Sequence, residues 1–327
     1  MKSEIRSASV RFGDGQRYPS GAMRILSLAL ALCIAACAGE SSPTTPSPQP
    51  VPAPAPAPVP QPAPAPTTIS VVGTLTDTVS HAVIGTFTRD VPRLPAMITV
   101  SAPGHVERAT RVGSSSPTVD LIPTAAPFSS IFYGQLARNT LEAATPDVIR
   151  TLPVAPSLYL QTQGLSGGNI EHLLAAAREI VPLMTGNRYQ LSTVETGPQT
   201  RPPQAGWVVV DIINDKSDES CGRAIVGAVN GHIWLNVAQS DAGCTFGTDV
   251  ISQSVMRHEM SHALGFSHID VPNSLMYYRT NRGAGLPTDL ERYHAAIAYQ
   301  RQAGNRDPDN DSPTSTPLAV RDRVVVD

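Results

Sequence analysis

One stretch constrains this chain more than any other: residues 258–268, which read HEMSHALGFSH. His258 and His262 are four residues apart, so on a helix they lie on the same face, one turn apart. Gly265 can take the positive backbone φ that ends such a helix, and the chain can then turn back to present His268. Three imidazoles that converge in this way can hold one metal ion and leave a fourth position open. The spacing therefore predicts a helix that carries a metal site.

Glu259 follows the first histidine and adds a carboxylate that a purely structural metal site does not need. Beside a metal ligand, this carboxylate can act as the base that takes a proton from water. Two other interpretations stay open, a buried helix with incidental histidines and a metal site without catalysis. The five fixed positions of the pattern weigh against the first, and Glu259 weighs against the second.

The pattern HExxHxxGxxH resembles that of the metzincin zinc metalloproteases, and a second motif extends the resemblance. Residues 274–278 read SLMYY, with Met276 eight residues after His268, an interval similar to that of the matrixin branch. The resemblance implies a zinc ion on the three histidines and a tight turn in which Met276 forms the apolar floor beneath them. An ordinary core methionine is the alternative interpretation of Met276.

Two departures leave the metzincin subfamily open. Matrixins usually have proline where this chain has Tyr278, whereas astacin-like and serralysin-like metzincins have tyrosine. The resemblance implies that the Tyr278 hydroxyl approaches the metal or stabilises an oxyanion, and a tyrosine packed in the turn is the alternative. Ile269, rather than a polar residue, follows the third histidine. Asp289 lies where matrixins have an acidic residue that binds the methionine turn, and it can equally cap the last helix.

An apolar run over residues 25–36 is too short to span a membrane and fits the core of a signal peptide. It ends in the letters IAAC, which resemble a bacterial lipobox and imply a lipid on Cys37. The alternative is a secretory signal cut near Ala36 or Ala38. We expect residues 1–37 to be an N-terminal extension and lipoprotein signal peptide. The chain would then be exported and anchored to a bacterial membrane, with Ala38 favouring the outer membrane.

Cys221 and Cys244 remain after this signal, and we expect them to form a disulfide in an oxidising compartment. A net charge of −3 gives no attraction to nucleic acid. Calcium binding stays open without support, because Asp211, Asp241 and Asp249 form no spaced calcium loop.

The composition divides the chain. Residues 41–68 contain only a few residue types and are rich in proline and alanine, which favours a polyproline II spacer, with a ligand for a proline-binding module as the alternative. Short alternating runs at 69–75, 82–88, 97–100 and 119–122 predict a small β-sandwich, with a weak resemblance at residues 99–105 (TVSAPGH) to carboxypeptidase-regulatory-like modules. The expected parts are a linker (38–68), the β-sandwich (69–122), a connector (123–153), a metzincin-like catalytic domain (154–304) and a disordered tail (305–327).

Within the catalytic domain the patterns predict an α+β fold, a mixed twisted sheet with the zinc helix and methionine turn. Asn169 is expected to cap the first helix, and Asn230-Gly231 is a strong hairpin turn signal. One strand of that hairpin, 224–229 by first choice, is implied by the resemblance to align an extended peptide. The expected strands of this domain are 158–161, 189–194, 207–213, 223–229 and 232–237, and its expected helices are 170–184, 249–265 and 288–301. A further helix is expected in the connector, at 130–140.

These observations predict a zinc-dependent endopeptidase at the bacterial cell surface, which cuts protein or peptide substrates. The resemblance implies that zinc polarises a bound water and the scissile carbonyl, while Glu259 passes the proton to the leaving amine. Two alternatives stay open: an inactive zinc-containing surface binding lipoprotein, and a zinc hydrolase of non-peptide amides.

Overall fold

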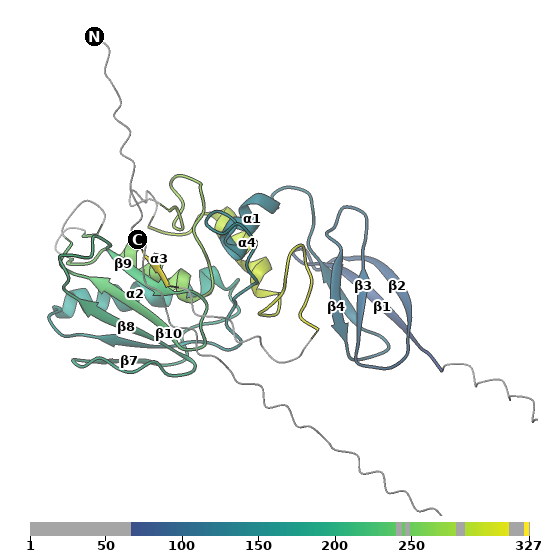
Figure 1. Ribbon diagram of the computed structural model, residues 1–327, viewed down its shortest axis with the longest axis horizontal. Helices are drawn as coiled ribbons and strands as arrows, with labels where there is room; N and C mark the ends of the chain where they lie inside the picture. Colours follow the sequence, from purple (N-terminus) through teal and green to yellow (C-terminus); the bar gives the residue numbers. More distant parts are fainter. Residues whose placement is uncertain (1–66, 240–243, 246–248, 279–284, 314–323, 327) are drawn as a thin grey trace, which may run out of the picture. The chain divides into compact units, whose positions relative to one another are not determined.

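The computed structural model describes residues 67–239, 244–245, 249–278, 285–313 and 324–326. Within these residues the chain forms three β-sheets and four α-helices (Figure 1). The predicted α+β class is therefore confirmed. In this part of the chain no helix combines the length and the apolar content that crossing a bilayer requires.

The first five strands form two small sheets that share one hydrophobic cluster. In one sheet β1 lies between β2, which is antiparallel to it, and β5, which is parallel; in the other, β3 and β4 form an antiparallel pair. Val71 and Leu75 of one sheet and Ile98 and Val112 of the other are buried in the same cluster. The strands are β1 (Ile69–Asp77), β2 (Val83–Val91), β3 (Ala96–Val100), β4 (Arg108–Val112) and β5 (Thr118–Leu121).

Strand β4 was not predicted, because a charged residue hides its alternation. Its inward positions are Arg108, Thr110 and Val112, and Arg108 is only 6% exposed. An arginine at an inward position breaks the apolar pattern from which a strand is usually recognised.

The larger sheet has six strands in the order β11-β9-β10-β8-β6-β7. β10, β8, β6 and β7 are parallel to one another, while β9 is antiparallel to β10 and β11 is antiparallel to β9. β8 lies inside the sheet, as its continuous apolar run predicted. The strands are β6 (Ser157–Gln161), β7 (Val194–Gly197), β8 (Trp207–Ile213), β9 (Gly222–Ile225), β10 (Gly231–Asn236) and β11 (Val324–Val326).

The edge strand β7 differs from its predicted position. The sequence predicted a strand at 189–194, but the paired residues are Val194–Gly197. Tyr189 is instead held by two hydrogen bonds outside the sheet. Its backbone N–H donates to the Thr185 hydroxyl at 3.1 Å, and its side-chain hydroxyl donates to the Pro153 carbonyl at 2.9 Å. Side-chain hydrogen bonds to nearby backbone compete with a strand here.

Each helix begins at a residue whose side chain accepts a backbone N–H. Ser166, and not Asn169, caps the second helix, because its hydroxyl accepts the N–H of Asn169 at 3.2 Å. The third helix begins after Ser252, later than the predicted residue 249. The helices are α1 (Ser130–Arg138), α2 (Gly167–Met184), α3 (Gln253–Ala263) and α4 (Asp289–Tyr299).

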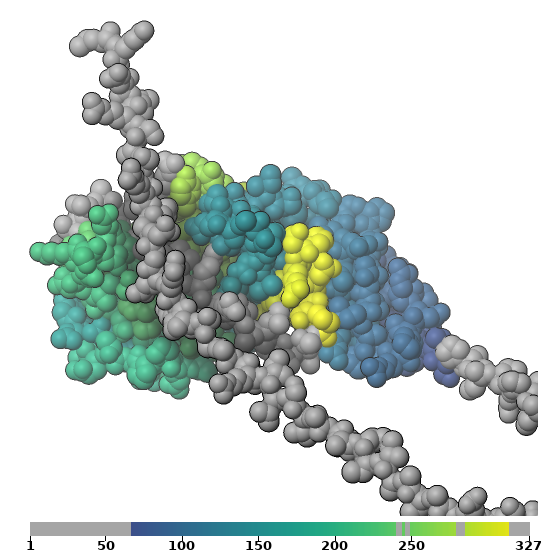
Figure 2. Space-filling view, viewed as in Figure 1, coloured from purple at the N-terminus to yellow at the C-terminus, as the bar shows by residue number. Residues whose placement is uncertain are grey.

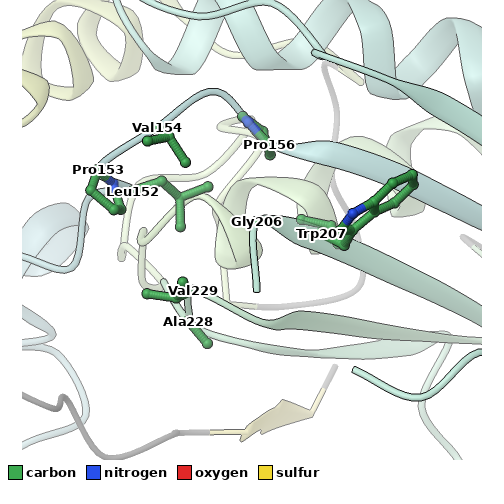
Figure 3. Close-up of a pocket in the computed structure, with 9 residues that line it drawn as sticks. Leu152, Pro153, Val154, Pro156, Gly206, Trp207, Ala228 and Val229 are labelled. Atoms are coloured by element: carbon green, nitrogen blue, oxygen red, sulfur yellow. The ribbon is translucent and has the colours of Figure 1, made fainter. Parts of the chain in front are cut away.

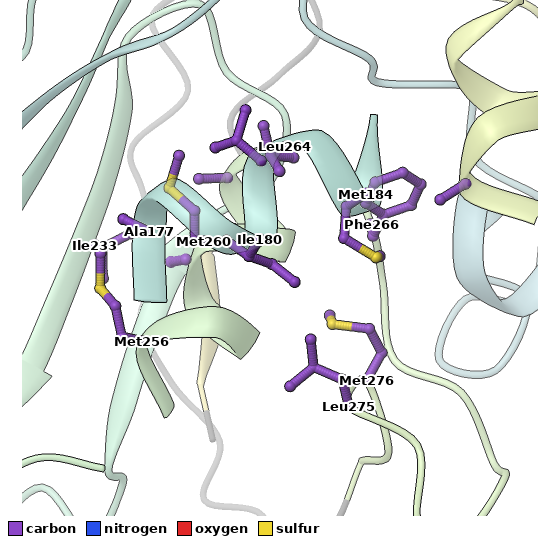
Figure 4. Packing of buried hydrophobic residues seen from close by; sticks show 14 of the residues in the cluster. Ala177, Ile180, Met184, Ile233, Met256, Met260, Leu264, Phe266, Leu275 and Met276 are labelled. Atoms are coloured by element: carbon purple, nitrogen blue, oxygen red, sulfur yellow. The ribbon is translucent and has the colours of Figure 1, made fainter. Parts of the chain in front are cut away.

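One large core joins the six-stranded sheet to the helices. Val208, Val210 and Ile233 of the sheet are buried in the same cluster as residues of α2 and α3. Figure 4 shows the methionines and aliphatic side chains of α2, α3 and the 274–277 turn in this core. Helix α3, which carries His258 and His262, thus packs against both the sheet and α2 through apolar contacts.

The segment after α4 packs between two parts of the fold. Asp309 and Asp311 exchange backbone hydrogen bonds with Ala109 of β4, and Asn305 pairs with Ile149. In the space-filling view the yellow segment that follows α4 lies against the blue surface of the first five strands (Figure 2). Disorder was predicted from residue 305, and this is wrong for residues 305–313, because Asn305 and Asp309 are fully buried and hydrogen-bonded. The low hydrophobicity that suggested disorder reflects polar side chains that are used inside the protein.

The signal peptide, Cys37 and nearly all of the proline-rich linker fall on residues 1–66 and lie outside the described residues. Export and lipidation therefore stay predictions.

Candidate metal centre

The three histidines of the pattern meet at the end of α3. His258 and His262 are on consecutive turns of α3, and His268 follows on the loop after Gly265. Gly265 has φ +108°, a backbone conformation that residues other than glycine rarely adopt. All three imidazoles are buried, with His268 the most exposed at 4%. The helix stop and return that the sequence predicted therefore bring the rings together.

Each imidazole is oriented through its Nδ1 atom. Nδ1 of His258 lies 2.6 Å from the Leu275 carbonyl oxygen, and Nδ1 of His262 lies 2.8 Å from that of Phe266. A carbonyl oxygen only accepts hydrogen bonds, so Nδ1 carries the proton in both rings. In the neutral ring the lone pair then lies on the Nε2 atom, and a neutral imidazole is the form that ligates a metal.

The three Nε2 atoms converge on one point. They are separated by 3.0 Å (His258 to His262), 3.2 Å (His262 to His268) and 3.3 Å (His258 to His268). Three lone pairs gain nothing from facing one another, whereas a cation between them would bind all three. Among the described residues, these three histidines are the cluster whose ligand atoms could hold a metal ion.

Glu142 completes the set of Nδ1 partners and was not predicted. Its Oε1 atom lies 2.5 Å from Nδ1 of His268. The two residues are 126 positions apart in the sequence, so no local spacing could have indicated the pair. A carboxylate on the outer nitrogen fixes the ring orientation and makes the inner nitrogen a stronger ligand.

The turn that contains Met276 is anchored by Glu291 of α4. The Glu291 carboxylate accepts the backbone N–H groups of Leu275 at 3.2 Å and Met276 at 2.8 Å. Because the Leu275 carbonyl oxygen accepts the hydrogen bond from Nδ1 of His258, Leu275 links Glu291 to the cluster of three histidines. Asp289 was the residue expected either to bind this turn or to cap the helix. The structure gives the turn to Glu291 and the cap to Thr288.

Met276 itself is fully buried in the main core, and its carbonyl oxygen accepts the Ile269 N–H at 2.8 Å. The turn is thereby tied to the residue that follows the third histidine. A role as the floor of the metal site stays a prediction.

Glu259 lies where α3 passes β9. Its side chain is fully buried, and a Cβ atom added to Gly222 of β9 would lie 2.8 Å from its Oε1 atom. Only a glycine at this position leaves room for the carboxylate. The need for a glycine here depends on which strand packs against α3, so the sequence alone did not single out Gly222.

Tyr278 ends the methionine turn and is 37% exposed, next to the ring of Tyr277 at a centroid distance of 5.0 Å. Its backbone N–H donates to the Ile269 carbonyl at 3.3 Å. The proposed action of its hydroxyl on a substrate stays a prediction.

Cys221 and Cys244 form the predicted disulfide, with Cα atoms 5.1 Å apart. Cys221 directly precedes Gly222, so the crosslink fixes the start of β9, the strand that contacts Glu259.

Two further histidine–carboxylate pairs lie outside this cluster of three histidines. His232 has Nε2 at 2.8 Å from Asp211 and its ring stacked on Trp234. Asp249 pairs with His172 at 2.9 Å. Two of the three candidate calcium ligands are therefore engaged elsewhere, and Asp241 lies outside the described residues.

A pocket at the start of β8 carries no charged side chain (Figure 3). Its lining is almost entirely apolar, so it offers nothing for metal chemistry. The lining residues are Leu152, Pro153, Val154, Pro156, Gly206, Trp207, Val208, Ala228 and Val229.

A comparison with models of known protein families finds no match, and a comparison with curated proteins finds no relative.

Proposed function

We propose that this chain is a zinc-dependent endopeptidase that hydrolyses peptide bonds of protein substrates. The observation that carries the proposal is the convergence of three Nε2 atoms within 3.0–3.3 Å, on the helix that also carries the buried Glu259. A metal site with three protein ligands and a nearby carboxylate is the arrangement of a hydrolytic centre.

The ligand spacing supports zinc as the ion. Zinc–nitrogen bonds of about 2.0–2.1 Å at tetrahedral angles place the nitrogens roughly 3.3–3.4 Å apart. The separations of 3.0–3.3 Å among the Nε2 atoms need only a small expansion. When bound, zinc would supply Lewis-acid chemistry, which polarises a carbonyl group and makes water more acidic.

The side chains have distinct parts in the proposed reaction. Glu259 takes a proton from the attacking water and delivers it to the leaving amine. Gly222 leaves the space that this carboxylate occupies, and burial keeps the site largely dry. Leu275, Phe266 and Glu142 hold the three imidazoles in the form that ligates.

The disulfide supports an exported protein, since such crosslinks persist mainly in oxidising compartments. Tethering at a bacterial surface through Cys37 is part of the proposal and rests on the lipobox resemblance.

The test is cleavage of an unfolded protein by the purified chain, alongside Glu259→Gln and a chelator. We expect Glu259→Gln to retain zinc, measured by elemental analysis, and to lose at least about a hundredfold in kcat. A matched control is Glu171→Gln, because Glu171 is an exposed carboxylate on α2 and its loss should leave cleavage unchanged. A zinc-loaded wild-type chain that cuts nothing, or an active Glu259→Gln variant, would reject the proposal.

A further inference from the structure

Strand β9 runs along the helix that carries the metal site. At its start Gly222 touches the Glu259 carboxylate. Just beyond its end, the Gly227 N–H donates to the His262 carbonyl at 3.0 Å, and a Cβ at Gly227 would lie 3.0 Å from the Gly265 Cα. A peptide paired with the outer side of β9 would therefore pass along the helix face that bears Glu259 and the ligands.

The outer side of β9 is already paired with a distant part of the same chain. One side of β9 pairs with β10, and the other pairs antiparallel with β11 (Val324–Val326). Val324 lies opposite Ile225, Val325 opposite Ala224 and Val326 opposite Arg223. In Figure 1 this short yellow strand lies beside β9 and α3.

A strand edge can pair with only one extended chain at a time, because each backbone N–H and C=O on that side takes one ladder partner. The three consecutive valines strongly favour an extended backbone. The ladder is nevertheless short, three residues against about five to six in an average strand. Such a strand can hold the edge and still be displaced by a longer extended peptide.

We propose that the segment Val324–Val326 is an internal competitor for the β9 edge. It occupies the place of an extended peptide and thereby weakens the binding of a peptide substrate at that edge. This inference rests on the proposed peptidase function for its consequence, but the occupancy of the edge is a separate property. It also gives the run of three valines, which the catalytic domain does not otherwise use, a place in the fold.

The first test is kinetic and uses the full chain with Val324→Gly, Val325→Gly and Val326→Gly combined. Glycine weakens an extended strand, so the freed edge should lower KM for an unfolded protein substrate about threefold or more, with kcat unchanged. Val83→Gly is the matched control, because Val83 is an exposed valine in β2, far along the sequence from the site. An unchanged KM in the triple variant would overturn the proposal.

The second test needs no catalysis. A fluorescent peptide of residues 318–327 (LAVRDRVVVD) is titrated with the triple-glycine chain that also carries Glu259→Gln, and anisotropy reports binding. We expect this peptide to bind at least threefold more tightly to the triple-glycine chain than to one that retains its own valines. A peptide with the three valines replaced by glycine should bind neither.

The two proposals fail in different ways. Binding of the valine peptide without cleavage of any protein would reject the peptidase function and support an occupied edge. Equal weak binding of both peptides would overturn the internal competitor, even if the chain cuts protein efficiently.

Discussion

Glu142 is the residue on which the orientation of the third histidine depends. Its carboxylate accepts from Nδ1 of His268 at 2.5 Å, and its side chain is 39% exposed. Glu142→Ala removes this partner without opening the core. We expect zinc affinity to fall about 10–100-fold, measured by competition with a chromophoric chelator. Glu171→Ala is the control for loss of a surface carboxylate, and an affinity equal to that of the wild type would show that His268 needs no such partner.

Gly222 determines where the Glu259 carboxylate can lie. In Gly222→Ala the new methyl group would lie 2.8 Å from Oε1 of Glu259, so the carboxylate must move. A displacement of about 1 Å at a reacting group can cost about a hundredfold in rate. We therefore expect kcat to fall about a hundredfold while zinc content stays at the wild-type level. Gly113→Ala is the control, since a Cβ there meets nothing within 4 Å. Equal losses in both variants would mean that crowding of Glu259 is not the cause.

At the scale of single residues, the sequence predicts the three histidines but not the residues that orient them or leave room for Glu259. His258, His262 and His268 are linked by helix geometry, which depends only on spacing. Glu142 and Gly222 reach the site through tertiary contacts, and nothing in their neighbours in sequence marks them.

Helix α4 holds the methionine turn through one carboxylate. Glu291 is fully buried, and it accepts the N–H groups of Leu275, Met276 and Thr288 as well as the Thr288 hydroxyl. Burial raises the pKa of Glu291, and these donors partly offset the shift. The carboxylate therefore joins two elements, the start of α4 and the turn beside the metal ligands.

Glu291→Ala would leave these buried donors without an acceptor. We expect the free energy of unfolding in urea to fall by about 3 kcal/mol or more. Glu291→Gln keeps one acceptor oxygen and should cost about 1–2 kcal/mol, whereas the exposed Glu171→Ala should change stability by no more than about 0.5 kcal/mol. A loss in Glu291→Ala as small as that of Glu171→Ala would contradict the anchoring role.

Elements that a local sequence pattern marks were predictable. Elements whose position depends on side-chain hydrogen bonds competing with strand pairing were not. The hairpin of β9 and β10 follows from Asn230-Gly231, and the mid-sheet position of β8 follows from its apolar run. Thr288 and Glu291 form a capping box, a pattern that can be recognised in the sequence. Asp289, which was expected to bind the turn or to cap this helix, does neither. The position predicted for β7 was wrong because Tyr189, at the start of the predicted strand, forms hydrogen bonds with Thr185 and Pro153 instead of with a neighbouring strand.

Across the whole molecule, a cluster of buried charges joins β4, β5 and the segment after α4. Arg108 pairs with Asp120 at 2.7 Å and with Asp311 at 2.9 Å, and Arg301 pairs with Asp309 at 2.8 Å and with Asp120. Its members are up to 203 residues apart, so composition suggested a disordered tail where the fold uses the same polar residues as internal partners. Loss of any one member should destabilise the fold, because the remaining charges stay buried with one partner fewer.

Asp311 makes the stability of this cluster depend on pH. Burial alone would raise the pKa of Asp311, but Arg108, Thr110 and Asn305 together lower it below the ordinary value of 3.8. A carboxyl whose pKa is lower in the folded state stabilises the protein above its unfolded pKa. That contribution is lost as the pH falls from 3.8 through the lowered pKa.

Asp311→Asn should therefore destabilise the protein strongly at neutral pH and much less in acid. We expect a loss of about 2–3 kcal/mol at pH 7, from the charged hydrogen bonds of a side chain with no exposed surface, measured by urea unfolding. The difference from the wild type should shrink progressively as the pH is lowered below 3.8, because protonation of Asp311 then favours the unfolded wild-type chain. It should be smallest below the lowered pKa, where the folded wild-type carboxyl is also neutral. Asp90→Asn, at an exposed position of β2, should show a small difference at every pH. A difference for Asp311→Asn that stays constant through this range would mean that Asp311 stabilises the cluster by shape and hydrogen bonding rather than by its charge.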